Sequence, residues 1–147
     1  MTAALPIRGS CLCGGVRFEI TGRPLWLTYC HCSRCRKVGG QANLTVRAED
    51  FRWVSGAELV ARYRPDPPFH LVRCFCGGCG TYLGDPEASP KLFPIAASAL
   101  DDDPGVRPAL HEHVAGKAPW YQILDDLPQY EGDPPLSAFA PRPAEPA

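Results

Sequence analysis

Apolar and polar residues alternate in several short stretches of the chain. In residues 15–20, the apolar side chains at positions 16, 18 and 20 alternate with Arg17 and Glu19, as expected for a strand with one buried face. Similar patterns predict strands at 43–47, 58–63, 70–75, 81–83, 91–97 and 110–114. The connecting segments are rich in Gly, Pro and Asp, which favour turns, and only one helical turn is expected, around Arg34–Val38. The pattern therefore predicts a mainly β fold of short antiparallel strands with little helix.

Length and composition predict one domain followed by a tail. The chain has 147 residues, of which 45% are hydrophobic and 21% charged, and these values are typical of a globular domain. After Gly132 the sequence reads DPPLSAFAPRPAEPA, and such a run of prolines and alanines cannot build a core. We expect a domain over residues 7–132 and a disordered Pro/Ala-rich tail over residues 133–147.

The charge balance argues against large anionic partners. Lys and Arg number 15 and Asp and Glu number 16, giving a formal net charge of −1. This leaves no overall basic field for nucleic acid or an anionic membrane. The first residues, MTAALPIRGS, contain no apolar signal segment, and no apolar run approaches the roughly 20 residues that span a bilayer. The expected location is therefore cytoplasmic.

The eight cysteines need an explanation in such a protein. They occupy positions 11, 13, 30, 32, 35, 74, 76 and 79. A reducing cytosol disfavours disulfides, whereas Cys-x-Cys places two sulfurs on one face of an extended segment, where they can share a metal ion. CSRC and CGGC have the two-residue gap of zinc knuckles. Zinc is therefore favoured over disulfides. A thioredoxin-like motif is also disfavoured, because CFCGGCG looks like a tight turn and not the start of a helix.

Spacing alone leaves two ways to complete the first pair, Cys11 and Cys13. They can combine with Cys76 and Cys79 or with part of the group at 30–35. The glycines of CGGCG favour Cys76 and Cys79, because Gly77, Gly78 and Gly80 allow a close turn whose N–H groups point at the sulfurs. Four thiolates would then surround one structural zinc ion and stabilise the fold. The remaining cysteine, Cys74, is expected to be a small buried apolar residue.

Four segments together resemble one known family. They are GSCLCGGVRFEI (9–20), CHCSRCRKVGG (30–40), RCFCGGCGTYL (73–83) and LHEHVAGKAPWYQILDDLPQYEG (110–132). In this order they resemble the glutathione-dependent formaldehyde-activating enzyme / centromere protein V family, from about Arg8 to Gly132. The resemblance implies a β-tent fold with two zinc ions per chain. It implies a structural zinc on Cys11, Cys13, Cys76 and Cys79, and a catalytic zinc on Cys30, Cys32 and Cys35.

The same resemblance implies a reaction. The family's named activity adds the glutathione thiol to formaldehyde, giving S-(hydroxymethyl)glutathione, so a carbon–sulfur lyase is expected with a small thiol and a small aldehyde as partners. Three protein ligands leave one tetrahedral position open, which a thiol can fill as the thiolate. The alternative is a zinc-stapled β-tent module that binds a protein or carries a thiol without catalysis. A fourth protein ligand on the second zinc would favour that alternative.

Residues beside the second cysteine group are candidates for further roles. Three basic residues could meet the carboxylates of glutathione, although a solvated basic turn explains them equally well: Arg34, Arg36 and Lys37. His31 is expected to point away from the metal. His111 and His113 are expected on one face of a strand as surface or core histidines, with a fourth ligand or a proton shuttle as the alternative.

Overall fold

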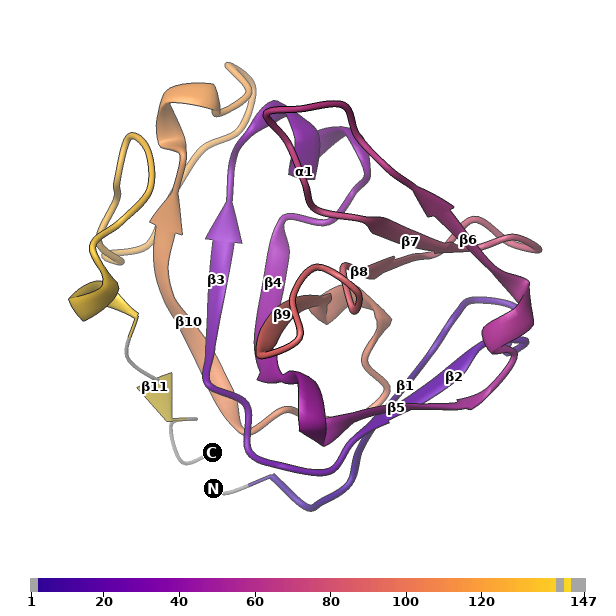
Figure 1. Ribbon diagram of the computed structural model, residues 1–147. Coiled ribbons are helices and arrows are strands. Elements are labelled where there is room, and N and C mark those ends of the chain that lie inside the picture. The colour runs from indigo at the N-terminus through magenta and orange to yellow at the C-terminus, as the bar shows by residue number, and fades with distance from the viewer. Residues whose placement is uncertain (1–2, 140–141, 144–147) are drawn as a thin grey trace.

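Two β-sheets form the fold of the computed structural model, which describes residues 3–139 and 142–143 (Figure 1). The smaller sheet has the strand order β1–β2–β5 and is antiparallel. Its strands are β1 (Ile7–Ser10), β2 (Arg17–Ile20) and β5 (Phe51–Ser55). The mainly β prediction is confirmed.

The larger sheet has the strand order β11–β10–β3–β4–β9–β8–β7–β6. Its strands are β3 (Trp26–Cys30), β4 (Ala42–Arg47), β6 (Val60–Tyr63), β7 (Arg73–Cys76), β8 (Tyr82–Gly84), β9 (Leu92–Ala96), β10 (Val106–Glu112) and β11 (Arg142–Pro143). The expectation of antiparallel strands holds except between β10 and β3, which pair in parallel.

Helical structure is confined to short turns. The only α-helix of the described residues, α1 (Ser33–Lys37), lies at the predicted helical turn. The 3-10 helices are η1 (Ala48–Asp50), η2 (Ala57–Leu59), η3 (Ala97–Ala99), η4 (Val114–Gly116) and η5 (Leu136–Ala138). None of the described helices is long and apolar enough to cross a membrane.

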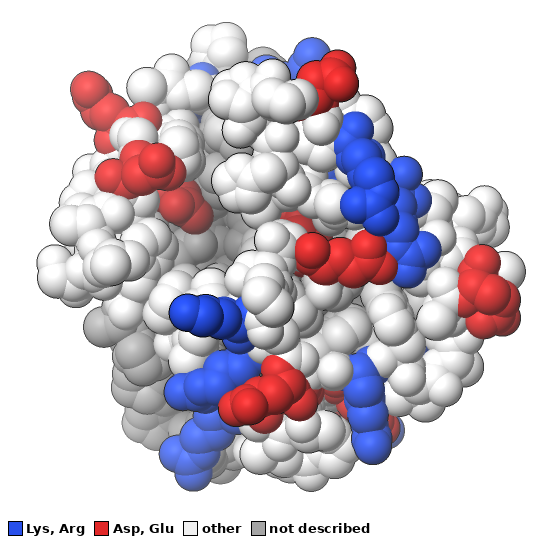
Figure 2. Space-filling model, viewed as in Figure 1, with Lys and Arg blue, Asp and Glu red and all other residues white. Residues whose placement is uncertain are grey.

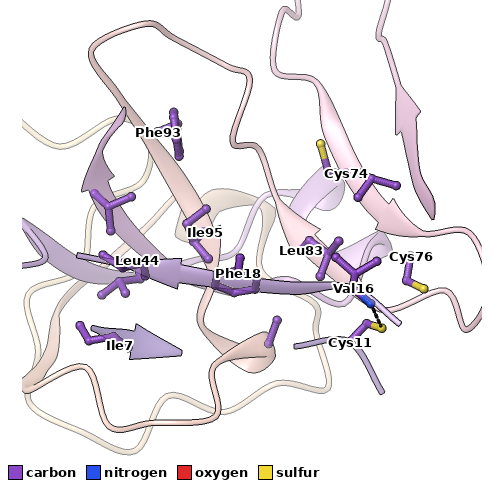
Figure 3. Close-up of a cluster of buried hydrophobic side chains, with 14 of the residues drawn as sticks. Ile7, Cys11, Val16, Phe18, Leu44, Cys74, Cys76, Leu83, Phe93 and Ile95 are labelled. Carbon is purple, nitrogen blue, oxygen red and sulfur yellow. Dashed lines mark hydrogen bonds between the residues drawn. The ribbon is translucent and has the colours of Figure 1, made fainter. Parts of the chain in front are cut away.

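The core lies where the two sheets pack against each other. Phe18 of β2 lies 5.5 Å from Phe51 of β5, and Phe51 lies 5.6 Å from Phe93 of β9, measured between ring centroids. Leu44 and Ile95 are fully buried in the same cluster (Figure 3). Burial of this apolar surface from both sheets is the main stabilising contribution to the fold.

The segment after Gly132 returns to the domain as far as it is described. η5 and Phe139 follow, and the Phe139 ring lies 5.2 Å from the ring of Trp26 on β3. Residues 142–143 pair with β10. Residues 140–141 and 144–147 of the expected disordered tail lie outside the described residues, and the domain boundary at 132/133 stays a prediction.

The loop between β6 and β7 crosses the end of the large sheet next to α1 (Figure 1). A contact fixes this arrangement, because the guanidinium carbon of Arg34 on α1 lies 3.7 Å from the ring centroid of Phe69 in the loop. This stacked geometry is a cation–π contact. The loop thereby lies beside the second group of cysteines.

Surface charge is mixed on the face seen in Figure 2. Lys and Arg side chains form small groups there with Asp and Glu beside them, and no continuous basic surface is visible. This distribution agrees with the near-zero net charge.

Candidate metal and thiol-binding site

The first cysteine group joins two distant parts of the chain. The sulfurs of Cys11, Cys13, Cys76 and Cys79 all lie within 4.8 Å of one another. Cys11 and Cys13 Sγ are 3.5 Å apart, and Cys13 and Cys76 Sγ are 3.8 Å apart. A disulfide bond would be about 2.05 Å long, whereas a tetrahedral zinc ion with bonds of about 2.3 Å separates its sulfur ligands by about 3.8 Å. The group therefore fits a closed tetrahedral metal site.

Backbone geometry holds this group together in a way that differs in detail from the sequence-based expectation. The Val16 N–H donates to Cys11 Sγ at 3.2 Å (Figure 3). Gly77 and Gly80 instead donate their N–H groups to carbonyl oxygens, at 2.8 Å each. Gly80 has φ +79°, which favours glycine. The turn residues thus shape the loop, and the N–H bond to Cys11 Sγ comes from Val16, the residue before β2.

The second cysteine group lies at one end of β3. Cys30 is the last residue of that strand, Cys32 caps the N-terminus of α1, and Cys35 lies within α1. The Cys35 N–H donates to Cys32 Sγ at 3.3 Å. The three sulfurs lie within 4.8 Å of one another. No other Cys, His or carboxylate of the described chain joins them, so these residues offer three ligands to a metal ion.

A cavity of about 670 Å³ opens beside the second group. Thr28, Asn43 and Thr45 place polar groups on its sheet side, and Phe69 belongs to the β6–β7 loop on another side. Its lining residues are Trp26, Thr28, Cys30, Cys32, Ser33, Arg34, Cys35, Asn43, Thr45, Phe69, His70, Leu71, Arg73, Asp85, Leu92, Pro94, Glu112, His113, Asp133 and Phe139. All three cysteines of the second group therefore face a space large enough for a small ligand.

The three basic candidates have different positions. Arg34 lines the cavity and stacks on Phe69. Arg36 and Lys37 are not among the lining residues; Lys37 is exposed, and Arg36 Nε is buried without a hydrogen-bond partner in the described part of the chain. Arg34 is thus the one of the three that can meet a ligand in the cavity.

A carboxyl group that the sequence analysis did not single out also faces the cavity. Glu112 pairs with Cys30 across β10 and β3, and its Oε1 accepts a hydrogen bond from Thr28 Oγ1 at 3.0 Å. Burial raises the pKa of the Glu112 carboxyl. A parallel pairing between distant segments brings Glu112 here, and no local pattern signals such a pairing.

The histidines do not share one face, contrary to expectation. β10 ends at Glu112, and His113 has the left-handed φ of 55°. His113 therefore lines the cavity, where its Nε2 lies 2.8 Å from Asp133 Oδ1. His111 is buried on β10 and lies away from the cavity lining.

His31 and His111 are both buried and form a chain of hydrogen bonds that ends at Asp125. His31 Nε2 lies 2.7 Å from His111 Nδ1, and His111 Nε2 lies 3.0 Å from Asp125 Oδ2. With Asp125 ionised, His111 donates to the carboxylate and accepts from His31. Burial lowers the pKa of His31. His31 is absent from the cavity lining, so its placement agrees with the expectation that it points away from the metal.

Three buried polar side chains, those of Arg73, Tyr82 and Asp85, form a hydrogen-bonded cluster next to Cys35. Arg73 Nη1 donates to Cys35 Sγ at 3.6 Å and to the Tyr82 hydroxyl at 3.0 Å. The Tyr82 hydroxyl donates to Asp85 Oδ1 at 2.8 Å. Burial raises the pKa of Asp85, and the positive charge of Arg73 opposes that shift. The sequence analysis missed this group; an arginine within a predicted strand directly before a cysteine motif was the available signal.

Cys74 belongs to neither cysteine group. It is fully buried in the core (Figure 3), and burial raises the pKa of its thiol to about 12. The prediction of a small buried apolar residue is confirmed.

Comparisons with known proteins place the chain in a family. The family model of the glutathione-dependent formaldehyde-activating enzyme matches residues 6–116. A Halomonas elongata protein named "Putative glutathione-dependent formaldehyde-activating enzyme" is 33% identical over 127 residues, covering 80% of each chain. The crystal structure of a Rhodobacter sphaeroides protein is 30% identical, with a TM-score of 0.54, and the match covers 69% of this chain and 92% of that one. The chain belongs to the glutathione-dependent formaldehyde-activating enzyme family.

Proposed function

We propose that the protein is a zinc-dependent carbon–sulfur lyase that adds a small thiol, such as glutathione, to formaldehyde or another small aldehyde. The observation that carries the proposal is the position of Cys30, Cys32 and Cys35: three clustered sulfurs at the wall of a cavity of about 670 Å³. The family name and the name of the Halomonas relative support the choice of thiol and aldehyde.

Two zinc ions per chain fit the two groups of sulfurs. Cys11, Cys13, Cys76 and Cys79 would hold the structural ion, and Cys30, Cys32 and Cys35 would hold the other. Zinc held by these three cysteines would have a fourth position free and would favour the thiolate form of an incoming thiol. A reducing cytoplasm would keep the eight thiols free for this role.

The cavity would position the two reactants. Arg34 is placed to bind a carboxylate of the thiol, and Thr28, Asn43 and Thr45 offer hydrogen bonds to its polar groups. The apolar side chains of the lining, among them Trp26 and Phe139, would exclude water from the aldehyde. Holding thiol and aldehyde in one orientation would accelerate the addition.

The reaction requires one proton to move from sulfur to oxygen. Glu112 is placed to take the thiol proton, because it faces the cavity opposite Cys30. Its Oε1 is bonded to Thr28, so Oε2 would hold the proton. The sulfur lone pair then forms the C–S bond as the carbonyl π bond breaks, and Glu112 returns the proton to the resulting oxygen. Atoms and charges balance without an oxidant or reductant.

A thiol carrier without catalysis is the second candidate. In that role, the protein would bind a thiol at the same open zinc position but would not accelerate its addition to an aldehyde. A closed protein-binding module fits less well, because the described chain supplies only three Cys, His or carboxylate ligands to the second group.

Exchange spectroscopy by NMR separates enzyme from carrier. The zinc-loaded wild-type protein should accelerate the interconversion of formaldehyde plus glutathione with S-(hydroxymethyl)glutathione, and Cys74→Ser should do so equally. Cys32→Ser should give only the uncatalysed rate. A wild-type protein that binds glutathione without changing the exchange rate is a carrier, and one that does neither contradicts the proposed function.

A further inference from the structure

We propose that Arg73 is a positioning residue for the site formed by Cys30, Cys32 and Cys35. It would hold the Cys35 side chain in place and offset the negative charge of the three thiolates. The inference rests on the proposed function in one respect: it takes the group of Cys30, Cys32 and Cys35 to hold zinc. It goes further by assigning a role to a buried cation that lies on a strand remote in sequence from those cysteines.

The geometry places the guanidinium directly against the sulfur. Arg73 Nη1 donates to Cys35 Sγ at 3.6 Å. The Arg73 side chain is 4% exposed and Cys35 is 7% exposed. Water therefore competes little for this bond, and a hydrogen bond between a cation and a thiolate is stronger than one between neutral groups.

Two further residues fix the orientation of Arg73. Its Nη1 also donates to the Tyr82 hydroxyl at 3.0 Å, and its Nε lies 3.8 Å from Asp85 Oδ1. Tyr82 in turn donates to Asp85 at 2.8 Å. Gly40, which follows α1, makes room for this group, because a Cβ there would lie 2.3 Å from the Tyr82 ring.

Stability alone does not account for such a group. Taking an arginine and an aspartate out of water costs free energy that their mutual attraction offsets only in part. Asp85 is 1% exposed, so the desolvation is nearly complete. Asp85 instead helps to hold the guanidinium of Arg73 with its positive N–H group against Cys35 Sγ, where water screens this charge less than it would screen a surface arginine.

The site needs such a charge. Three thiolates and Zn²⁺ carry a net charge of −1, and an incoming thiolate would raise it to −2. The N–H bond from Arg73 withdraws electron density from Cys35 Sγ, so zinc would attract the incoming sulfur more strongly. It also makes Cys35 a weaker nucleophile, which directs the aldehyde to the incoming thiolate and away from the protein's own ligand.

Cobalt substitution tests this role without measuring activity. Thiolate-to-cobalt charge-transfer absorption that is lost in Cys32→Ser belongs to the three-cysteine site. In the double variant Arg73→Met/Asp85→Asn, which removes both buried charges, this absorption should shift to longer wavelength. Zinc affinity at the site should fall about 10- to 100-fold. Arg73→Lys should restore part of both properties, and Arg62→Met, which changes an arginine on the neighbouring strand β6, should alter neither.

Tyr82→Phe, which removes a single hydroxyl group, provides a second test if the double variant does not fold. Tyr82→Phe keeps both charges but releases one anchor of Arg73, and it should produce a smaller shift in the same direction. If the double variant folds, an unshifted band together with unchanged zinc affinity would overturn the inference. If it does not fold, an unshifted band in Tyr82→Phe would do so. Absence of any Cys32-dependent band in the wild type would contradict the metal site itself. A normal band without glutathione exchange would contradict only the proposed reaction.

Discussion

Glu112 and Cys30 stand opposite each other on two parallel strands, β10 and β3, and both face the same cavity. The pairing brings a half-buried carboxyl group to a cluster of three thiols. The two residues are far apart in sequence, and β3 and β10 are the only described strands that pair in parallel. A group that can move a proton thereby lies beside the group proposed to bind the thiol.

Glu112→Gln should slow the formaldehyde–glutathione exchange about 10²-fold or more while leaving the zinc content unchanged. Glutamine keeps the shape and can still accept from Thr28, but it cannot take a proton. Burial raises the pKa of Glu112, and only the ionised carboxylate can accept a proton. The wild-type rate should therefore fall as the pH drops through that raised pKa, and the variant should lack this part of the pH profile.

The exposed residue Glu131 provides the control for this measurement. Glu131→Gln should retain the wild-type rate and pH profile. Equal rates in Glu112→Gln and wild type would remove Glu112 from the proton path.

Cys76→Ser should destabilise the fold far more than Cys74→Ser. Cys76 belongs to the four-sulfur group that ties the segment after β1 to the end of β7, and loss of a structural zinc removes folding free energy directly. Cys74 is buried outside both groups. Thermal melts with zinc analysis compare the two, and the reverse order of melting temperatures would mean that the ligands are assigned wrongly.

Phe139→Ala should open one side of the cavity. The Phe139 ring packs 5.2 Å from Trp26, and both residues line the cavity. An aromatic pair contributes about 0.5–1.5 kcal/mol beyond its buried area, so we expect a small loss of stability and a red shift of the Trp26 fluorescence. Leu136→Ala, at a residue that is 88% exposed, is the matched control. Identical spectra for the two variants would show that the segment after Gly132 does not cover the cavity in solution.

The strands that alternate cleanly were predictable from sequence, and several others were not. β2 buries Phe18 and Ile20, its alternate positions, and the alternating Leu44 and Val46 marked β4, in which the polar residues between them are buried as well. β3 has buried residues on both faces, so the alternation that marks a half-buried strand is absent from WLTYC. β1 contains Gly9 opposite Phe18, and a glycine in so short a strand hides its pattern.

Each cysteine motif was predictable because its spacing is local, whereas the joining of Cys11 and Cys13 to Cys76 and Cys79 depended on the glycines of CGGCG and on the family resemblance. The rest of the site was not predictable. Cys-x-Cys and Cys-x-x-Cys bring sulfurs together whatever the wider topology. Arg73, Asp85 and Glu112 reach the second group only through the order of strands in the large sheet. His113 was misplaced because β10 ends at Glu112, two residues before the predicted end of the strand at position 114.

The central claim is that Cys30, Cys32 and Cys35 hold a zinc ion with one position open to a thiol, and calorimetric titration tests it most directly. Glutathione should bind the zinc-loaded wild-type protein, and S-methylglutathione, which lacks the free thiol, should bind much more weakly. Cys32→Ser should stay folded, carry about one zinc ion fewer and lose glutathione binding. Equal binding of the two ligands to the wild type, or full zinc content and unchanged glutathione binding in Cys32→Ser, would contradict the account.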